Sequence, residues 1–435
     1  MNYEALVLGS GPAGFEAALK LAQGGLSTAI ITATPPGGRA TVGSLLPSKV
    51  WLHHAHHSEA GTPQDIPAAA AEVRATITGR VAYTRATLEA AGVTIVSGQA
   101  TLTGPHSVEV RSGEGSAAEL REITADYIVL ANGSEPIFFP AVKPDGKRII
   151  APRHTQHLQE LPESLIMIGG GVTGVEYSSV FARLGTRVQM LSFDPLLPRS
   201  DREYTDRLES MLRDLGVAIE TGVAVSAVEN LGDRVQVTRK DGSTMEAAYA
   251  FIATGRAGDL TFLDTRSPEL RKTADGRFVA VDSQGRSSEP SIFACGDVTG
   301  PPLTANKAVL QARRVVAAVL GTAAPPEDTA VIEAVYTQPQ LAQVGPVLQL
   351  VGRSDLRIVR KSYAASMLGQ VHGSADGEIK LWVDSSDHIH GAAAWGESAS
   401  EVLAPVQVAM QTGSTLEALS SVPFAYPSLT EVVTA

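Results

Sequence analysis

Two glycine-rich segments have the residue types and the spacing needed to bind phosphates. They are residues 9–14, GSGPAG, and residues 169–174, GGGVTG. In the pattern G-x-G-x-x-G the first glycine permits a tight turn, the second lets the backbone approach a pyrophosphate, and the third allows a helix to pack closely on a strand. The N-terminus of that helix adds the positive end of its dipole. The residues expected to bind two dinucleotides are Gly9, Gly11, Pro12 and Gly14 in the first segment, and Gly169, Gly171 and Gly174 in the second.

The elements around both segments are those that such a site requires. A short apolar run precedes each segment, at residues 5–8 and 165–168, and a helical pattern follows. A β-type run comes next, at residues 27–31 and 187–191. One G-x-G-x-x-G alone is a weak indication. Two of them, each in a strand–turn–helix–strand context, predict an α/β fold with two Rossmann-like dinucleotide-binding domains.

Further apolar runs extend this architecture. Three of them end at a glycine turn and cover residues 127–131, 249–253 and 291–294. Buried strands whose carboxyl ends face a ligand crevice have this form. Beyond residue 324 the pattern changes, because alternating runs at 378–383 and 388–393 precede a helical pattern over 398–412. This predicts a separate C-terminal α+β domain with an antiparallel sheet.

Composition limits the chemistry of these sites. The chain has 435 residues and a net charge of −11, so a nucleic-acid partner is not expected. No run of about 20 apolar residues could span a membrane, and the first residues do not resemble a targeting signal, so we expect a cytoplasmic protein. Cys295 is the only cysteine. A single cysteine excludes an intramolecular disulfide, a dithiol redox centre and a multi-cysteine zinc site.

A histidine tract near residue 55 raises the question of a metal. His53 and His57 are four residues apart in a predicted helix and could chelate an ion on one helical face. No carboxylate or cysteine has a compelling spacing to join them. We therefore expect a solvated or interface helix and no metal site.

Together these motifs resemble the pyridine nucleotide-disulfide oxidoreductases, and among them the branch of dihydrolipoamide dehydrogenase, mercuric reductase and glutathione reductase. The similarity runs essentially from end to end. Residues 131–134 (ANGS) stand where the family has A-T-G-S, 253–256 (ATGR) match its second such turn, and 293–297 (FACGD) match F-A-x-G-D. Residues 335–339 (VYTQP) resemble the start of the family's dimerisation domain.

The resemblance implies a homodimer with three domains in each subunit. The FAD domain would comprise residues 1–140 and 266–324, the NAD(P) domain residues 141–265, and the α+β dimerisation domain residues 325–435. FAD would bind at the first glycine segment, and NADPH or NADH at the second. The further candidate cofactor contacts are Gly38, Ala100, Ser134, Gly255 and Asp297, the last of which binds the ribityl chain of FAD in the family.

Both dinucleotide folds depart from the usual pattern at the end of their second strand. A carboxylate normally binds ribose hydroxyls there, whereas this chain has Thr32 and Ser192. At Ser192 the lost carboxylate removes repulsion toward a 2′-phosphate. Arg199 matches one of two arginines that bind this phosphate in the glutathione reductase branch, although Phe193 stands at the other position. These residues favour NADPH as the nucleotide, while NADH, or the use of both nucleotides, stays possible.

The largest departures concern the disulfide chemistry of the family. The redox motif G-G-T-C-L-N-V-G-C-I-P-S-K corresponds to residues 37–49, where Ala40 and Leu45 occupy the two cysteine positions. The C-terminal motif H-P-T-x-S-E begins here with Tyr426, and no histidine follows His390. A shift of the alignment by one residue would put Ser44 at the second position. Because alanine, leucine and serine form no thiolate, disulfide reduction and mercuric reduction of the family type are excluded.

The flavin half of the site matches the family. Lys49 and Glu176 stand at the positions of the lysine near flavin N5 and of its glutamate partner. We expect this pair to tune N5, where hydride arrives. The alternative is an inherited structural salt bridge. The other candidate catalytic residues are Tyr426 and Glu431 of the C-terminal motif.

These residues predict an FAD-dependent NAD(P)H dehydrogenase of the diaphorase or quinone reductase type. Without a dithiol, electrons must pass from flavin directly to a small, quinone-like acceptor. Its pocket would be lined by Ala40, Leu45 and the partner subunit's Tyr426. The alternative function is a catalytically inactive flavin-binding homologue with a scaffold or regulatory role.

Overall fold

The first of three main sheets carries the N-terminal glycine turn. The computed structural model describes residues 2–58, 65–113, 119–326 and 330–434. The parallel strands of this sheet lie in the order β3 (Thr94–Ser97), β2 (Thr28–Thr32), β1 (Asn2–Leu8) and β6 (Glu119–Leu130). Three more strands extend it. β5 (Ser107–Ser112) pairs antiparallel with β6, β4 (Gln99–Gly104) pairs antiparallel with β5, and β17 (Ile292–Ala294) runs parallel beside β6.

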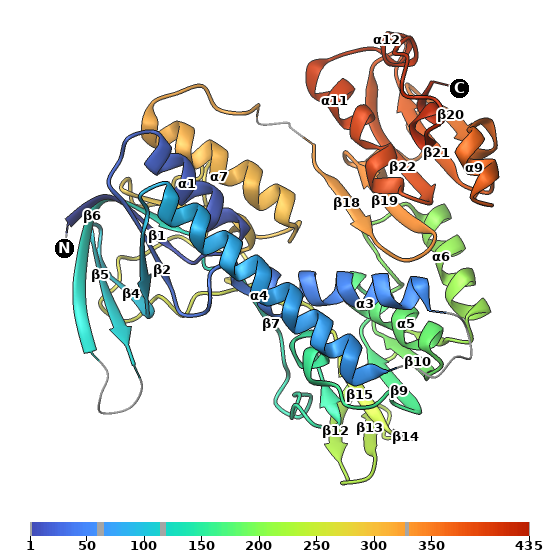
Figure 1. The fold of residues 1–435 in the computed structure, drawn as a ribbon, viewed down its shortest axis with the longest axis horizontal. Coiled ribbons are helices and arrows are strands. Elements are labelled where there is room, and N and C mark those ends of the chain that lie inside the picture. Colours follow the sequence, from blue (N-terminus) through green and yellow to red (C-terminus); the bar gives the residue numbers. More distant parts are fainter. Residues whose placement is uncertain (1, 59–64, 114–118, 327–329, 435) are drawn as a thin grey trace.

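Helices cover this sheet, which is why its central strand β1 ends in an uninterrupted apolar run. Ala5 to Leu8 are fully buried. Parallel strands are buried on both faces by the helices that connect them. On one face α1 (Pro12–Gln23) packs against α7 (Ala305–Leu320), side by side in Figure 1. Chain segments far apart in sequence thus build one layer.

The second sheet repeats the design around the second glycine turn. Its five strands are all parallel, in the order β11 (Ala218–Thr221), β10 (Arg187–Ser192), β9 (Ser164–Ile168), β15 (Tyr249–Ile252) and β8 (Ile149–Ile150). The helix α5 (Val172–Leu184) follows β9, and α6 (Arg202–Asp214) follows β10. A small antiparallel sheet lies beside them, formed by β12 (Val225–Asn230), β13 (Val235–Arg239) and β14 (Thr244–Ala247).

Two features join the halves that carry these sheets. A ribbon pairs β7 (Ser134–Pro136), which follows β6, with β16 (Arg256–Gly258), which follows β15. The helix α3 (Leu45–His57) leaves the first half after α2 (Gly38–Val42) and packs on α5 of the second. The long α4 (Ile66–Ala90) runs from α3 back toward α1, as Figure 1 shows.

The C-terminal part is an antiparallel sheet with short helices. Its strands lie in the order β18 (Ile332–Val335), β19 (Gln340–Val344), β22 (Ile389–Gly396), β21 (Glu378–Val383) and β20 (Arg357–Ser362). The helices are α8 (Val347–Leu350), α9 (Met367–Val371), α10 (Ala399–Val402), α11 (Ala404–Thr412) and α12 (Leu416–Ser420). The predicted α/β fold with a C-terminal α+β part is thus confirmed, whereas the exact domain boundaries stay a prediction.

Two details differ from the sequence prediction for physical reasons. The single helix predicted over residues 398–412 is divided into α10 and α11, because Pro405 has no N–H to continue the hydrogen-bond ladder. The strand predicted at residues 127–131 begins at Glu119, because its first residues pair with β5 and several remain exposed. An apolar run does not reveal such a partly solvated extension.

A buried polar cluster connects α6 to the C-terminal sheet. Lys380 on β21 is 4% exposed, and its Nζ lies 2.7 Å from Asp201 Oδ2 and 3.0 Å from Glu203 Oε2. The pKa of the Glu203 carboxyl is lowered to about 2, chiefly by its hydrogen bond from Arg360.

Among the described helices, none has both the length and the apolar character needed to cross a membrane.

Candidate active site

The first glycine turn leaves open space where a diphosphate would lie. Gly9 has a φ of 101°, and a Cβ there would overlap the carbonyl oxygen of Ala131. At Gly14 a Cβ would overlap the carbonyl oxygen of Gly9. Gly11 is different, because a Cβ there would meet no described atom within 4 Å. Gly9 and Gly14 therefore shape the turn, and Gly11 borders an open cradle.

The second turn has the same geometry. Gly169 has a φ of 118°, and a Cβ there would overlap the carbonyl oxygen of Ala253. A Cβ at Gly174 would overlap the carbonyl oxygen of Gly169. A Cβ at Gly171 would meet nothing within 4 Å in the described part of the chain. Neither α1, which Pro12 opens, nor α5 has a side-chain cap at its N-terminus. Both helix ends therefore offer free N–H groups, and both cradles fit a dinucleotide diphosphate.

The two residues that replace the ribose-binding carboxylates use their hydroxyl groups internally. Thr32 Oγ1 lies 2.7 Å from Ser10 Oγ and donates to Thr34 O at 2.7 Å. Ser192 Oγ donates to Asp194 O at 2.7 Å. Both hydroxyls satisfy the turn that follows their strand, so neither side chain presents a negative charge to a ribose.

The residues considered for a 2′-phosphate lie at the surface. The Arg199 side chain is 59% exposed, and its nearest acidic partner, Glu333, is 3.7 Å away. Phe193 is 69% exposed and carries no charge. Arg199 is therefore an exposed cation that could meet a 2′-phosphate, and the preference for NADPH stays a prediction.

Asp297 belongs to a hydrogen-bonded group at the carboxyl ends of β6 and β17. Its Oδ2 accepts from Ser134 Oγ at 2.6 Å. Arg256 donates to Ser134 Oγ at 2.8 Å and to Ser134 O at 2.5 Å. Next to them, Asn132 Oδ1 is buried and has no hydrogen-bond partner among the described residues. A set of polar groups with an unused buried acceptor suits a polyhydroxylated ligand such as the ribityl chain.

Lys49 and Glu176 meet at the junction of the two halves. Lys49 Nζ on α3 lies 2.8 Å from both carboxylate oxygens of Glu176 on α5, whose side chain is 3% exposed. The backbone N–H of Tyr336 donates to Glu176 Oε1 at 3.0 Å, and its ring centroid lies 4.3 Å from Lys49 Nζ. Tyr336 was not among the predicted site residues, because it lies in the VYTQP motif but contacts the pair through its backbone N–H and its ring.

The region that holds the disulfide in the family is apolar here. Ala40 lies in α2, and Leu45 opens α3 with 43% of its surface exposed. Cys295 is fully buried at the end of β17, and burial raises the pKa of its thiol to about 12. A thiol with such a pKa is neutral and unreactive at physiological pH.

The C-terminal candidates lie in the last segment of the chain, after α12. Tyr426 is 71% exposed, and its role in a pocket shared with a partner subunit stays a prediction. The Glu431 carboxylate accepts a hydrogen bond from the backbone N–H of Ser428 and so caps the turn Leu429–Val433. This contact gives Glu431 a structural function, and its catalytic role stays a prediction.

The other candidates occupy varied places. A Cβ on Gly38 would lie 2.7 Å from Gly11 Cα, so Gly38 adjoins the first cradle. Gly255 follows β15 with a φ of 95°. Ala100 is buried in the core on β4, so only its backbone could contact a cofactor. His57 Nδ1 bonds to His53 O at 2.8 Å, and no three potential ligands come together at a metal site in the described ranges.

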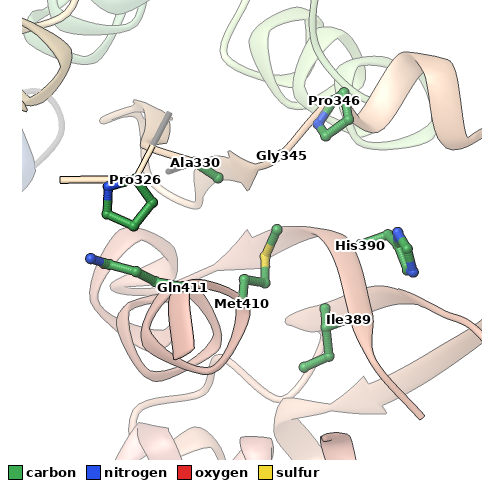
Figure 2. Close-up of a pocket in the computed structure, with 8 residues that line it drawn as sticks. All are labelled: Pro326, Ala330, Gly345, Pro346, Ile389, His390, Met410 and Gln411. Carbon is green, nitrogen blue, oxygen red and sulfur yellow. The ribbon is translucent and has the colours of Figure 1, made fainter. Parts of the chain in front are cut away.

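A separate cavity of about 210 Å³ lies in the C-terminal part. Figure 2 shows Met410 and Gln411 of α11 on one side, with Pro326 and Ala330 facing them. His390 also borders it and lies 2.8 Å from Asp384. None of its lining residues is a candidate cofactor or catalytic residue, so this cavity is distinct from the nucleotide clefts.

Lys307 is a buried charged residue beside Asp297 that sequence analysis missed. It is 9% exposed on α7, and its Nζ contacts Gly300 O and lies 3.4 Å from Thr299 Oγ1. Burial lowers the pKa of Lys307 to about 8, partly opposed by Asp297. A lysine within the amphipathic run of residues 305–320, which the sequence analysis did not assign to a helix, was the signal that could have identified it.

The pKa of Lys307 predicts a pH-dependent stability. Between pH 8 and about 10.4 the unfolded chain holds the lysine proton and the folded chain does not, so the free energy of unfolding rises with pH across that window. The rise amounts to about 3 kcal/mol from this group. Urea unfolding at pH 7.5, 9 and 10 should show that the free energy of unfolding of Lys307→Met lacks this rise with pH. Parallel profiles for wild type and variant would show that Lys307 titrates normally.

Comparison with known proteins agrees with this geometry. Residues 3–312 match the family described as pyridine nucleotide-disulphide oxidoreductase, and residues 331–435 match its dimerisation domain. A dihydrolipoyl dehydrogenase of Chlorobaculum tepidum is 30% identical over 453 residues, which cover 99% of this chain and 96% of that protein. An NAD(P)H dehydrogenase (quinone) of Mycobacterium tuberculosis is 28% identical over 461 residues, with coverage of 99% and 92%.

Solved structures show the same similarity. LpdA from Mycobacterium tuberculosis has a TM-score of 0.90 and 26% identity, covering 99% of this chain and 98% of that one. A Cu(II) complex of the HOCl-induced flavoprotein disulfide reductase RclA from Escherichia coli has a TM-score of 0.87 and 25% identity, covering 100% and 98%. The resemblance found in the sequence is therefore confirmed along the whole chain.

Proposed function

The chain belongs to the pyridine nucleotide-disulfide oxidoreductase family, and from this premise we propose that it is an NAD(P)H dehydrogenase that transfers electrons through FAD to a small, quinone-like acceptor without a redox disulfide. FAD and NAD(P)H are the cofactors of this family. The observation that carries the proposal is the Lys49–Glu176 pair, held at 2.8 Å in a chain whose one cysteine is buried elsewhere. We place the reaction in the cytoplasm, as predicted from the sequence.

The residues of the chain would bind and orient the two cofactors. The first cradle, at Gly11, would hold the diphosphate of FAD, with Asp297 and Ser134 at its ribityl chain. The second cradle, at Gly171, would hold NAD(P)H. Bound FAD supplies the acceptance and release of hydride equivalents at N5. Lys49, fixed by Glu176, would place a positive charge near that atom.

The apolar surface of Ala40 and Leu45 supports an acceptor with a planar ring. Neither side chain can form a covalent bond to the acceptor, so electrons would leave by direct transfer to a molecule held in contact. The dimerisation domain supports a homodimer, in which the partner subunit's Tyr426 would complete the pocket. The M. tuberculosis relative that is named as a quinone dehydrogenase favours this class of acceptor.

Tyr426→Phe tests the role of the exposed tyrosine. A neutral hydrogen bond contributes about 0.5–1.5 kcal/mol, so kcat/KM for a quinone should fall roughly 3- to 10-fold. The rate of FAD reduction by NAD(P)H should stay unchanged, because Tyr426 would act only on the acceptor side. Stopped-flow measurement separates the two half-reactions. Unchanged quinone kinetics would remove hydrogen bonding by Tyr426 from the mechanism.

Anaerobic titration of the purified protein tests the main proposal. A yellow protein whose visible flavin band bleaches on addition of NADPH or NADH, and recovers with a quinone such as menadione, would support an enzyme. Comparing the two nucleotides ranks their affinities. A protein that binds FAD but is not bleached would favour the second candidate, a flavin-binding scaffold. The absence of ribose-binding carboxylates at Thr32 and Ser192 supports this second candidate.

A further inference from the structure

The loop between β10 and α6 connects the second glycine turn to the C-terminal sheet. At the turn, the backbone N–H of Leu197 donates to Gly170 O at 3.1 Å. Leu197 is buried and has a φ of 45°, a left-handed conformation that a leucine keeps only where its surroundings enforce it. In a dinucleotide fold the end of the second strand, where this loop begins, borders the adenosine ribose. The loop is therefore fixed where it faces the second cradle.

Gln343 holds the other end of the loop. It is 5% exposed on β19, which packs against α6 beside the loop (Figure 1). Gln343 Nε2 donates to Arg199 O at 3.0 Å, and the backbone N–H of Asp201 donates to Gln343 Oε1 at 3.1 Å. Because one amide satisfies an acceptor and a donor of the loop, it fixes the backbone from which the Arg199 side chain projects.

Glu333 meets the Arg199 side chain from the neighbouring strand. It lies on β18, directly opposite Gln343 in the antiparallel pair of β18 and β19. Glu333 Oε2 is 3.7 Å from Arg199 Nη2, and 33% of the Glu333 side chain is exposed. Two cross-strand neighbours of the C-terminal sheet therefore act on one arginine of the nucleotide loop. Gln343 binds its backbone, and Glu333 pairs with its charge.

A 2′-phosphate at this loop would compete with Glu333 for Arg199. The phosphate and the carboxylate are both anions, so a guanidinium shared between them would bring like charges together. The 2′-hydroxyl of NADH carries no charge and meets no such cost. Ser192 supplies no carboxylate at the end of β10, whereas Glu333 supplies one from outside the dinucleotide fold.

We propose that Glu333 is a specificity-determining residue that lowers the affinity for NADPH relative to NADH, and that Gln343 is the positioning residue that keeps Arg199 opposite it. The inference rests on the proposed binding of NAD(P)H at the second glycine turn. It does not depend on the identity of the electron acceptor.

Equilibrium binding of NADP+ and NAD+ to the protein purified with its FAD tests the role of Glu333. Isothermal titration calorimetry would give both Kd values for wild type and Glu333→Gln. The Kd for NADP+ should fall roughly 3- to 10-fold, because the variant loses both the competing ion pair and the repulsion between two anions. The Kd for NAD+ should stay within about twofold of wild type. An unchanged ratio of the two Kd values would overturn the proposal. Wild type that binds neither nucleotide would instead refute the proposed function.

Arg199→Met shows whether the effect passes through the ion pair. In this background Glu333→Gln should leave the Kd for NADP+ within about twofold, since no guanidinium remains for the carboxylate to hold. An equal gain with and without Arg199 would contradict the proposal. Glu163→Gln is the matched control for charge. It removes a carboxylate from an exposed pair with Arg187 at the start of β9, the end of that strand away from the glycine turn. Its ratio of Kd values should equal that of wild type.

Gln343→Met tests the positioning role. Methionine has a similar length and forms neither hydrogen bond to the loop. With the loop backbone released, the gain in NADP+ affinity from Glu333→Gln should shrink to less than about twofold. Thermal unfolding checks that Gln343→Met is folded at the temperature of the titration. A full gain in this background would mean that Gln343 does not position Arg199.

Discussion

Replacing Lys49 by methionine is expected to slow the reduction of bound FAD by NAD(P)H roughly 100-fold. Bound FAD would gain negative charge on reduction, and the structure places the Lys49 ammonium at the junction of the two halves, where it could stabilise that charge. Its position is fixed by two contacts of 2.8 Å to Glu176 and by the ring of Tyr336. Removal of a preorganised charge that acts on the transition state lowers the rate without displacing the cofactor.

The same substitution also affects stability, because it leaves the Glu176 carboxylate buried. The remaining partner is the backbone N–H of Tyr336. Breaking a buried pair in this way costs about 3 kcal/mol, here toward the lower end because the Lys49 side chain is 28% exposed. Glu176→Gln keeps an acceptor for Tyr336 and leaves the lysine charge in place. We expect it to slow FAD reduction by less than about tenfold.

Lys380→Met separates the two effects. Lys380 pairs with Asp201 and Glu203 in a buried site between α6 and β21, remote from the candidate flavin contacts. This variant should lose similar stability and reduce its FAD at the wild-type rate. Stopped-flow absorbance at the flavin band gives the rates, and urea unfolding gives the stabilities. If Lys49→Met behaves like Lys380→Met, the Lys49–Glu176 pair is a structural salt bridge, as in the alternative hypothesis.

Local patterns predicted the parts of the site that depend on the backbone alone. The turns at Gly9 and Gly169 follow from glycine spacing, because a positive φ and close packing exclude other residues at fixed offsets. The strands with continuous apolar runs could equally be predicted from the sequence. These features need only neighbouring residues to be specified, so one sequence is sufficient to find them.

Contacts between distant segments could not be predicted from local sequence patterns. Lys49 and Glu176 are 127 positions apart, and only the resemblance to a family indicated that they meet. Tyr336 contributes a backbone N–H, which every residue except proline has, so its type gave no signal. Gln343 holds the backbone of the loop before α6 only because α6 packs against β19, which the sequence did not reveal.

The second large effect is expected at the glycines that border the two cradles. Gly171→Val should retain yellow colour and lose reduction by NAD(P)H, with an apparent Kd for the nucleotide raised on the order of 100-fold or more. Gly171 has extended backbone with φ −77° and ψ −178°, which any residue adopts, and a Cβ there meets no described atom within 4 Å. The Cβ of the valine therefore has room in the protein, and the side chain would occupy the space expected for the diphosphate.

Gly11→Val is the reciprocal variant. Gly11 has φ −68° and ψ −175° with the same open surroundings, so this chain should fold and purify without colour. Thermal unfolding checks that both apoproteins remain near the wild-type Tm. Gly174→Val should instead destabilise the fold, because its Cβ would overlap the carbonyl oxygen of Gly169. Reduction of Gly171→Val at the wild-type rate would mean that hydride does not reach FAD from the second cleft. In that case the assignment of the two nucleotides to the two turns would be wrong.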